Sequence, residues 1–274
     1  MIKIVLDSSS DLRELEGIDF ACAPLVISTD ERDYVDDATL DVRDMANTLY
    51  TYKGKSRTSC PNIEDWLAAF GDAEEIFVIT ITSSLSGSYN SARNAKLRYE
   101  EEHPERRVEL IDSFSTGPEI ALMAERIRDM VLEGMDFDTV REKIKEYRAE
   151  LIFVLESMKN LANNGRVSRL AATAAGLLGI RAIGRASEQG TLEMLGKSRG
   201  SARAVLDTVS FMKKFGYVGG RVIITNCLNE AMANTLKERL SSEYPGADIV
   251  VRESGGLCSF YAERGGLLIG FERE

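Results

Sequence analysis

The sequence predicts an α/β protein of two domains, an N-terminal domain with a parallel sheet and helices on both faces and a C-terminal α+β domain. Two observations lead to this prediction. In residues 1–149, short apolar runs alternate with amphipathic helical patterns, which is typical of parallel strand–helix–strand units. In residues 150–274, a glycine-rich stretch and a hairpin signal occur among further strands and helices, which indicates an α+β arrangement. We therefore expect the domain boundary near Ala149.

Apolar runs bounded by acidic, serine or glycine residues indicate the strands. In the first half we expect strands at residues 2–6, 23–27, 76–81 and 108–111. In the second half we expect a strand at 150–156, a hairpin of residues 181–185 and 191–195 around the turn SEQGT, and strands at 221–227, 248–253 and 266–272. The hairpin implies an antiparallel pair, so this half mixes hairpin and crossover connections.

Capping residues indicate where the helices begin and end. Asp41 and Asn62 stand at expected N-caps, and Gly71 stands at the end of the second of these helices. Ser86 or Ser88 is positioned to cap the next helix, which we expect to end near residue 102. Apolar residues at helical spacing predict four more helices, at residues 120–132, 137–149, 201–216 and 229–246.

The composition excludes several classes of function. Lys and Arg number 34 against 44 Asp and Glu, and the formal net charge of −10 argues against a nucleic-acid partner. The longest apolar runs fall well short of the roughly 20 residues that span a bilayer, and the N-terminus shows no signal-peptide pattern. We therefore expect a cytoplasmic protein without a stable membrane anchor. The four cysteines form no C-x-x-C pair and are expected to be free thiols.

The sequence lacks the common catalytic motifs. The chain has one histidine, His103, in the charged segment YEEEHPERR, where we expect an exposed helix end without a serine nucleophile beside it. The segment around Ser86 does not match G-x-S-x-G, because Ser84 occupies the position of the first glycine. Neither phosphate-binding glycine motifs nor acidic residues at metal-ligand spacing occur, so we predict no cofactor and no metal.

Hydroxyl-rich segments follow three predicted strands of the first half. DSSSD follows the first strand, SSLSGS the third and DSFSTG the fourth, and SRTSCPN lies just before a predicted helix. In an open parallel sheet, such segments meet beyond the carboxyl ends of the strands. Hydroxyls and free backbone N–H groups together suit one oxyanion, a carboxylate or a phosphate. Helix capping is the alternative explanation for each segment taken singly.

Basic residues gather in the second half, where NNGRVSRL and GKSRGSAR contain Arg166, Arg169, Lys197, Arg199 and Arg203. In an acidic chain, this concentration predicts a positive field for an anionic head group or an acidic partner. Scattered surface cations are the alternative.

Seven segments, taken in order, resemble the motifs of the DegV family, a family of bacterial fatty-acid-binding proteins. They are IKIVLDSSSDL, RTSCPN, ITSSLSGSYNSA, LIDSFSTGPE, LANNGRVS, GLLGIRAI and GKSRG, and they extend over nearly the whole chain. Each motif alone is weak evidence, whereas seven in this order are specific. The resemblance implies a two-domain protein with its ligand site between the domains.

The ligand that the resemblance implies is one long-chain fatty acid. Its carboxylate is expected at the hydroxyls of Thr58 and Ser86, and Ser59, Gly87 and Ser88 belong to the same two motifs. A neutral socket of hydroxyls and helix N-termini satisfies a carboxylate without a buried counter-charge. The fatty acid is a bound ligand in this scheme, and no cofactor is implied.

The resemblance gives a further role to one arginine, since Arg199 is expected near the head group. Arg166 and Arg169 are expected, from their positive charge, to contact a protein partner. The implied partner is a separate, ATP-dependent fatty acid kinase subunit, to which this chain presents the carboxylate. The chain itself is then a binding subunit and not an enzyme.

The C-terminal region departs from the family pattern. Many members carry H-T-G-P-G before the last strand, whereas this chain has SFYAERGG. Ala262 stands in the histidine position and Arg264 replaces a glycine. One head-group contact is therefore lost or is supplied by another residue, such as Tyr261, Glu263 or Arg264.

Two other functions stay open from the sequence. One is a phosphotransferase or hydrolase acting on a phosphorylated small molecule at the same strand ends, suggested by DSSSD and GKSRG. The other is a ligand-gated interaction protein, in which Arg166 and Arg169 dock an acidic partner.

Overall fold

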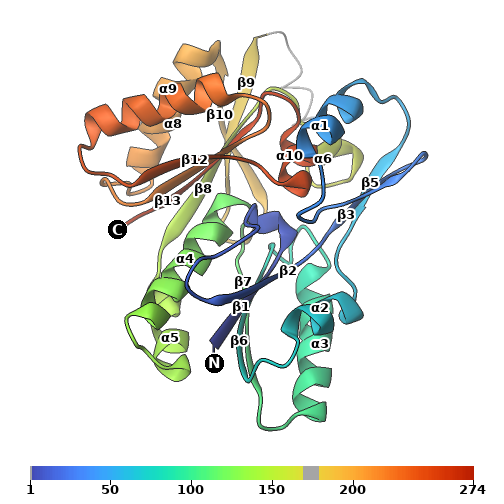
Figure 1. Cartoon of the computed structure of the whole chain (residues 1–274). Helices are drawn as coiled ribbons and strands as arrows, with labels where there is room; N and C mark the ends of the chain where they lie inside the picture. Colours follow the sequence, from blue (N-terminus) through green and yellow to red (C-terminus); the bar gives the residue numbers. More distant parts are fainter. Residues whose placement is uncertain (1, 169–178) are drawn as a thin grey trace.

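The N-terminal part is built on a parallel sheet. The computed structural model describes residues 2–168 and 179–274. Four parallel strands pair in the order β2-β1-β6-β7, namely β1 (Ile2–Asp7), β2 (Asp19–Ala23), β6 (Glu75–Thr80) and β7 (Arg107–Asp112). Helices cover both faces (Figure 1), with α4 (Pro118–Leu132) and α5 (Phe137–Lys143) on one and α2 (Ile63–Phe70) and α3 (Ser88–Glu102) on the other. The predicted α/β arrangement is confirmed.

The C-terminal part is built on a mixed sheet. Six strands pair in the order β10-β9-β8-β13-β11-β12, and every neighbouring pair is antiparallel except β11 with β12. The strands are β8 (Ala149–Leu155), β9 (Ile180–Ala186), β10 (Leu192–Arg199), β11 (Val222–Asn226), β12 (Ile249–Glu253) and β13 (Leu267–Glu272). The predicted hairpin is the β9–β10 pair, so the α+β character of this half is also confirmed.

The two faces of the six-stranded sheet are covered differently. On the helix face, Ile152, Val154, Ile183 and Ile269 pack under α8 (Ser201–Lys214) and α9 (Glu230–Glu243). On the opposite face, which we call the cavity face, Leu151, Phe153, Leu155 and Leu268 lie toward the N-terminal half. Alternation of side chains along each strand produces the two sets.

A small third sheet corrects one prediction. The strand expected at residues 23–27 is two strands, because Pro24 has no backbone N–H and interrupts the pairing. β2 ends at Ala23 in the parallel sheet, and β3 begins at Val26 in another sheet. That antiparallel sheet has the order β4-β3-β5, with β3 (Val26–Thr29), β4 (Asp33–Val35) and β5 (Ser56–Ser59).

The capping predictions are confirmed at two helices and wrong at a third. The side chains of Asp41 and Asn62 accept backbone N–H groups at the starts of α1 (Val42–Thr51) and α2, and Gly71 ends α2. At α3 the N-cap is Gly87, which makes no side-chain cap, so neither Ser86 nor Ser88 has the expected position. The helix expected over residues 137–149 is also shorter, since α5 and the 3-10 turn η2 (Ile144–Glu146) give way to β8.

Short helices connect the two halves. The 3-10 turn η1 (Ser8–Ser10) follows β1, α6 (Lys159–Asn163) follows β8, and α10 (Gly256–Ala262) follows β12. α10 contacts η1, β3 and α1, and α4 contacts β13, β11 and β8, so the two halves share an extensive boundary (Figure 1). Within the described part of the chain, no helix combines the length and apolar character needed to cross a bilayer.

Candidate functional site

An apolar cavity lies between the carboxyl ends of the parallel strands and the cavity face of the six-stranded sheet. It comprises about 660 Å³ of space not filled by atoms, including its opening to solvent. The apolar lining comes from both halves of the chain, and consists of Leu25, Ile81, Leu85, Leu151, Phe153, Leu155, Leu161, Leu192, Leu257, Cys258, Ala262 and Leu268. A lining of this kind suits a slender hydrocarbon.

Five polar side chains line this cavity. Thr116 donates its hydroxyl to the Ser9 carbonyl at 3.4 Å, and the other four are those of Thr58, Ser86, Arg166 and Tyr261. Thr58 Oγ1 and the Tyr261 hydroxyl oxygen are hydrogen-bonded at 2.7 Å. The Arg166 guanidinium carbon lies 5.9 Å from the centre of the Tyr261 ring, and its Nε donates to the Leu85 carbonyl at 3.2 Å. We call these four residues the polar cluster.

Burial raises the pKa of the Tyr261 phenol, while the hydrogen bond with Thr58 and the charge of Arg166 act in the opposite direction. The phenol is therefore neutral at ordinary pH and keeps its hydrogen for a bond. Ser86 Oγ accepts the backbone N–H of Ser88 at 3.2 Å, which leaves its own hydroxyl hydrogen to be donated elsewhere. Because Thr58 and Tyr261 share a hydrogen bond, one of their two hydroxyl hydrogens is already used. The polar cluster thus offers two hydroxyl donors, Ser86 and one of the Thr58–Tyr261 pair, and one guanidinium to an anionic group.

Local sequence explains how each group reaches this point. Side chains alternate along β5, so Thr58 is partly buried while its neighbour Ser59 is exposed. Ser86 lies in the loop between β6 and α3, immediately before the N-cap Gly87. Arg166 follows α6, and its placement depends on a turn at Gly165, which has φ 75°.

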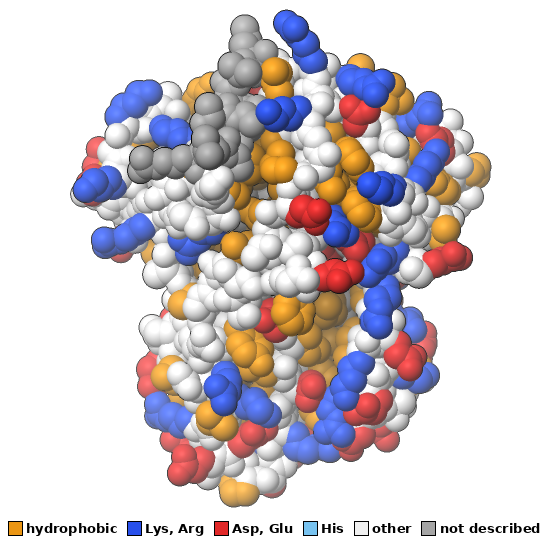
Figure 2. Space-filling model, turned by 180° about the vertical axis from the view of Figure 1, so that it is seen from behind, with side chains coloured by type: hydrophobic (Ala, Val, Ile, Leu, Met, Phe, Trp, Pro, Cys, Tyr) orange, Lys and Arg blue, Asp and Glu red, His pale blue; other side chains and the backbone are white. Residues whose placement is uncertain are grey.

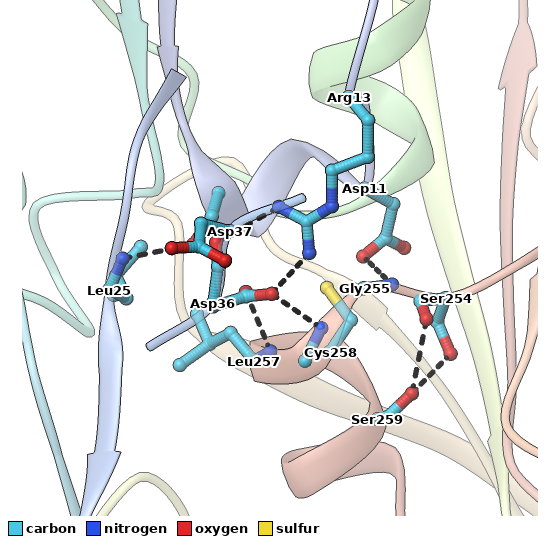
Figure 3. Close-up of polar contacts among 12 residues, drawn as sticks. Asp11, Arg13, Leu25, Asp36, Asp37, Ser254, Gly255, Leu257, Cys258 and Ser259 are labelled. Carbon is cyan, nitrogen blue, oxygen red and sulfur yellow. Dashed lines mark hydrogen bonds and ion pairs between the residues drawn. The ribbon is translucent and has the colours of Figure 1, made fainter. Parts of the chain in front are cut away.

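Tyr261 is carried by α10, and two buried carboxylates hold the start of that helix (Figure 3). Asp36 accepts the backbone N–H groups of Gly256 and Leu257 at 2.8 and 2.9 Å, and it also pairs with Arg13. Acidic groups at a helix N-terminus satisfy its unpaired N–H groups. The first half of the chain thereby fixes a helix of the second half, and with it one wall of the cavity.

Asp11 makes a second connection between the halves. Its carboxylate accepts the N–H of Gly255 at 2.7 Å (Figure 3). It also accepts the hydroxyl of Thr225 at 2.9 Å. Burial raises its pKa to about 6, against these hydrogen bonds, which lower it. The group is held by partners from β11 and from the start of α10, so it orients α10 from the side opposite Asp36.

The predicted site residues divide into those the structure brings together and those it does not. Thr58 and Ser86 line one cavity, and Arg166, expected to contact a partner, lines it with them. Ser88 is instead buried, and its Oγ donates to the Asp7 carboxylate at 2.6 Å, so its hydroxyl supports β1. Gly87 and Ser59 are exposed and do not line the cavity.

The two remaining arginines do not join the polar cluster. Arg199 is exposed at the last position of β10, whereas Leu192, at the first position, lines the cavity. Arg199 therefore does not line the cavity, and its expected role near the head group stays a prediction. Arg169 lies outside the described residues.

Of the three residues expected to replace the family histidine, Tyr261 is the one that lines the cavity. Ala262, in the histidine position, lines the cavity with a methyl group only. Glu263 accepts the N–H of Asn160 at 2.9 Å, and the Arg264 guanidinium lies 5.5 Å from the Tyr50 ring centre, so both point away from the cavity. Only the long-range pairing of α10 with β5 reveals that the phenol beside Ala262 meets Thr58.

His103 takes no part in the site. It is the C-cap of α3 and packs edge-on against the Tyr99 ring, with its side chain 39% exposed. Across residues 2–168 and 179–274, no three His, Cys, Asp or Glu side chains are arranged to hold a metal ion.

The fold and the site define an α/β protein with an internal apolar cavity that ends in hydroxyl and guanidinium groups. A family model described as an uncharacterised protein of the DegV family matches residues 1–274, and the chain belongs to this family. A DegV domain-containing protein of Streptococcus pneumoniae is 44% identical over an alignment of 276 positions, which covers 98% of each chain. The resemblance inferred from the seven motifs is therefore confirmed.

Solved structures of two relatives match the whole fold. A DegV family protein from Eubacterium eligens, loaded with heptadecanoic acid, is 43% identical, has a TM-score of 0.98 and matches over 100% of both chains. The Streptococcus pneumoniae Fatty Acid Kinase (Fak) B3 protein, loaded with linoleic acid, is also 43% identical, with a TM-score of 0.97 over 100% of this chain and 99% of that one.

Proposed function

We propose that this protein binds one long-chain fatty acid, with the acyl chain in the apolar cavity and the carboxylate at the polar cluster. The observation that carries the proposal is the cavity itself, in which Thr58, Ser86 and Tyr261 lie at the wall of an otherwise apolar space. Relatives that are 43% identical hold heptadecanoic acid and linoleic acid, which supports the same class of ligand here.

The energetics of such a ligand fit the two kinds of lining. Each buried CH₂ contributes about 0.8 kcal/mol, so an acyl chain of ~16 carbons gains on the order of 10 kcal/mol before the costs of binding. A carboxylate that leaves water costs several kcal/mol unless it receives hydrogen bonds. The hydroxyls of Ser86 and of the Thr58–Tyr261 pair supply them, and Arg166 adds a charge at the partly exposed edge.

In the proposed role, this protein presents the carboxylate of its bound fatty acid to a separate, ATP-dependent kinase subunit in the cytoplasm. The name of the pneumococcal Fatty Acid Kinase B3 protein supports this role. The chain contributes binding and orientation, and phosphoryl transfer belongs to the partner. The division into domains at residues 149 and 150 belongs to the same proposal, since β8 opens the second sheet at Ala149.

Unpaired cations near the polar cluster support docking of an acidic partner there. In the described part of the chain, Lys53, Lys159 and Arg264 have no carboxylate partner, and they line a polar groove between α1 and α6. On the face seen in Figure 2, by contrast, charges of both signs are interspersed, with hydrophobic side chains between them near the middle. Arg166, which connects the groove side to the cavity, is the cation that both ligand and partner reach in this scheme.

Lipid analysis of the purified protein tests the proposal. Native mass spectrometry of the wild-type protein is expected to find one fatty acid per chain. In Thr58→Ala combined with Ser86→Ala, occupancy is expected to fall at least about tenfold, since two hydrogen bonds to a charged group are each worth about 1.5–3 kcal/mol. Ser59→Ala, next to Thr58 on the exposed side of β5, is the matched control and should retain full occupancy.

Two outcomes would contradict the proposal. Equal occupancy in the double variant and in Ser59→Ala would remove the carboxylate from the polar cluster. Turnover of acyl phosphates or sugar phosphates by the isolated chain would instead favour the alternative of a phosphotransferase or hydrolase.

A further inference from the structure

The floor of the cavity has an unusual pairing of side chains between β8 and β9. Phe153 of β8 lies directly opposite Gly184 of β9, and Leu155 lies opposite Ala182. Side chains of paired residues point to the same face of a sheet, so the cavity face of β9 carries very little bulk at these positions. The largest residue of β8 thus stands opposite the smallest residue of β9.

The ring of Phe153 occupies the space that a side chain at position 184 would need. A Cβ atom built on Gly184 would lie 2.1 Å from Phe153 Cζ and 2.5 Å from Cε2. The ring is therefore folded down onto β9 and does not stand upright in the cavity. It is 2% exposed, and it lines the cavity midway along β8, between Leu151 and Leu155.

We propose that Phe153, resting on Gly184, sets the width of the cavity at its middle and thereby the bend of acyl chain that the protein accepts. This inference rests on the proposed function, because it assigns a property to the same cavity. Although it lies on β9, the ring still borders the cavity midway along β8, and a chain bent by a cis double bond at that level needs more width there than a straight saturated chain. Closely packed protein interiors respond to a change of a single methylene group, so one aromatic ring is enough to decide between two acids of equal length.

Substitution at position 153 changes the room in either direction. Phe153→Leu removes three carbons from the side chain, and Phe153→Trp adds bulk over Gly184. Gly184→Ala is less useful, because its Cβ would also approach the Glu193 carbonyl oxygen to 2.5 Å and disturb the hairpin. Phe271→Leu makes the same truncation at a fully buried residue of the helix face and is the matched control.

A competition between stearic acid and oleic acid tests the inference, since both have 18 carbons and differ in one cis double bond. Each delipidated protein is incubated with an equal mixture, and the bound acids are measured by native mass spectrometry. In Phe153→Leu we expect the ratio of oleate to stearate to rise roughly tenfold, within the range that one methylene of space can produce in an apolar pocket. In Phe153→Trp the ratio should fall. In Phe271→Leu it should stay within about twofold of wild type, because sites far apart in the structure do not couple.

The outcomes separate this inference from the proposed function. If the wild-type protein binds acid and both variants at position 153 keep the wild-type ratio, the assignment of Phe153 is overturned and the proposed function stands. If the wild-type protein binds neither acid, the proposed function and this inference are overturned together. If Phe153→Leu does not fold, as shown by loss of its thermal transition, the ratio in Phe153→Trp decides.

Discussion

The helix face and the cavity face of the six-stranded sheet are made from alternate residues of the same strands, yet they serve different purposes. On the helix face, Ile152 and Val154 are buried in one apolar cluster with residues of α8 and α9. On the cavity face, Leu151 and Phe153 border open space and share their side of the sheet with buried polar groups. One face therefore supplies stability, and the other gives up part of its packing to hold a ligand.

The largest expected effect separates the two faces by truncation. Phe271 is fully buried on the helix face, with its ring edge-on to Tyr217 at 5.7 Å between centres. Phe271→Ala is expected to lower the free energy of unfolding by about 3–5 kcal/mol, whereas Leu151→Ala on the cavity face should cost about 2 kcal/mol, because space already lies beside it. Chemical denaturation of the ligand-free proteins measures both values.

Ligand addition sharpens the same comparison. A fatty acid that binds the folded state raises Tm, and the increase follows its affinity. The increase is expected to be unchanged in Phe271→Ala and smaller in Leu151→Ala, since only Leu151 borders the cavity. Equal costs of the two truncations, together with equal shifts on ligand addition, would mean that the two faces do not differ in function.

The second effect concerns the carboxylate that fixes α10 against the cavity face. Asp36 accepts the N–H groups of Gly256 and Leu257 and pairs with Arg13. Asp36→Asn keeps the shape but replaces one acceptor oxygen by a donor group, so we expect a loss of about 1.5–3 kcal/mol. Because α10 carries Tyr261, fatty-acid occupancy should fall in the same variant. Asp33→Asn, at an exposed position of β4, is the control. Unchanged stability and occupancy in Asp36→Asn would show that α10 holds its place without this carboxylate.

The sequence predicted what depends on short-range patterns. Asn62 and Gly71 delimit α2 because capping needs only residues within one turn, and the strands of both sheets follow from apolar runs. Thr58 and Ser86 came from motifs, and the structure places both at one cavity.

The differences at the site depend on contacts between distant parts of the chain, whereas the break between β2 and β3 follows from Pro24 itself. The hydroxyl of Ser88 is bonded to Asp7, 81 positions away, so it is not available to a ligand. Arg199 is exposed at the last position of β10 and does not line the cavity, which no local pattern shows. Tyr261 meets Thr58 across 203 positions, and the sequence could name it only as one of three replacements for a missing histidine. Motifs therefore identified the region of the site, while the side chains that complete it emerged from the packing of the two halves.

The smallest effect tests a buried acid on the side of the sheet that holds the cavity. Glu119 lies in the first turn of α4, which packs on β13 beside Gly270. Burial raises the pKa of Glu119 to about 7, while its hydrogen bond from Ser115 acts in the opposite direction. The folded protein therefore keeps a proton that the unfolded chain releases near its ordinary pKa of 4.5. The wild-type free energy of unfolding is expected to fall as pH rises from about 4.5 to 7 and then to level off. In Glu119→Gln this part of the fall should disappear, with a gain on the order of 1 kcal/mol at pH 8 and little change near pH 4, as measured by denaturation across this range. A variant whose pH profile runs parallel to that of the wild type would show that Glu119 titrates alike in the folded and unfolded chains. The burial of Glu119 would then not lower the free energy of unfolding at high pH.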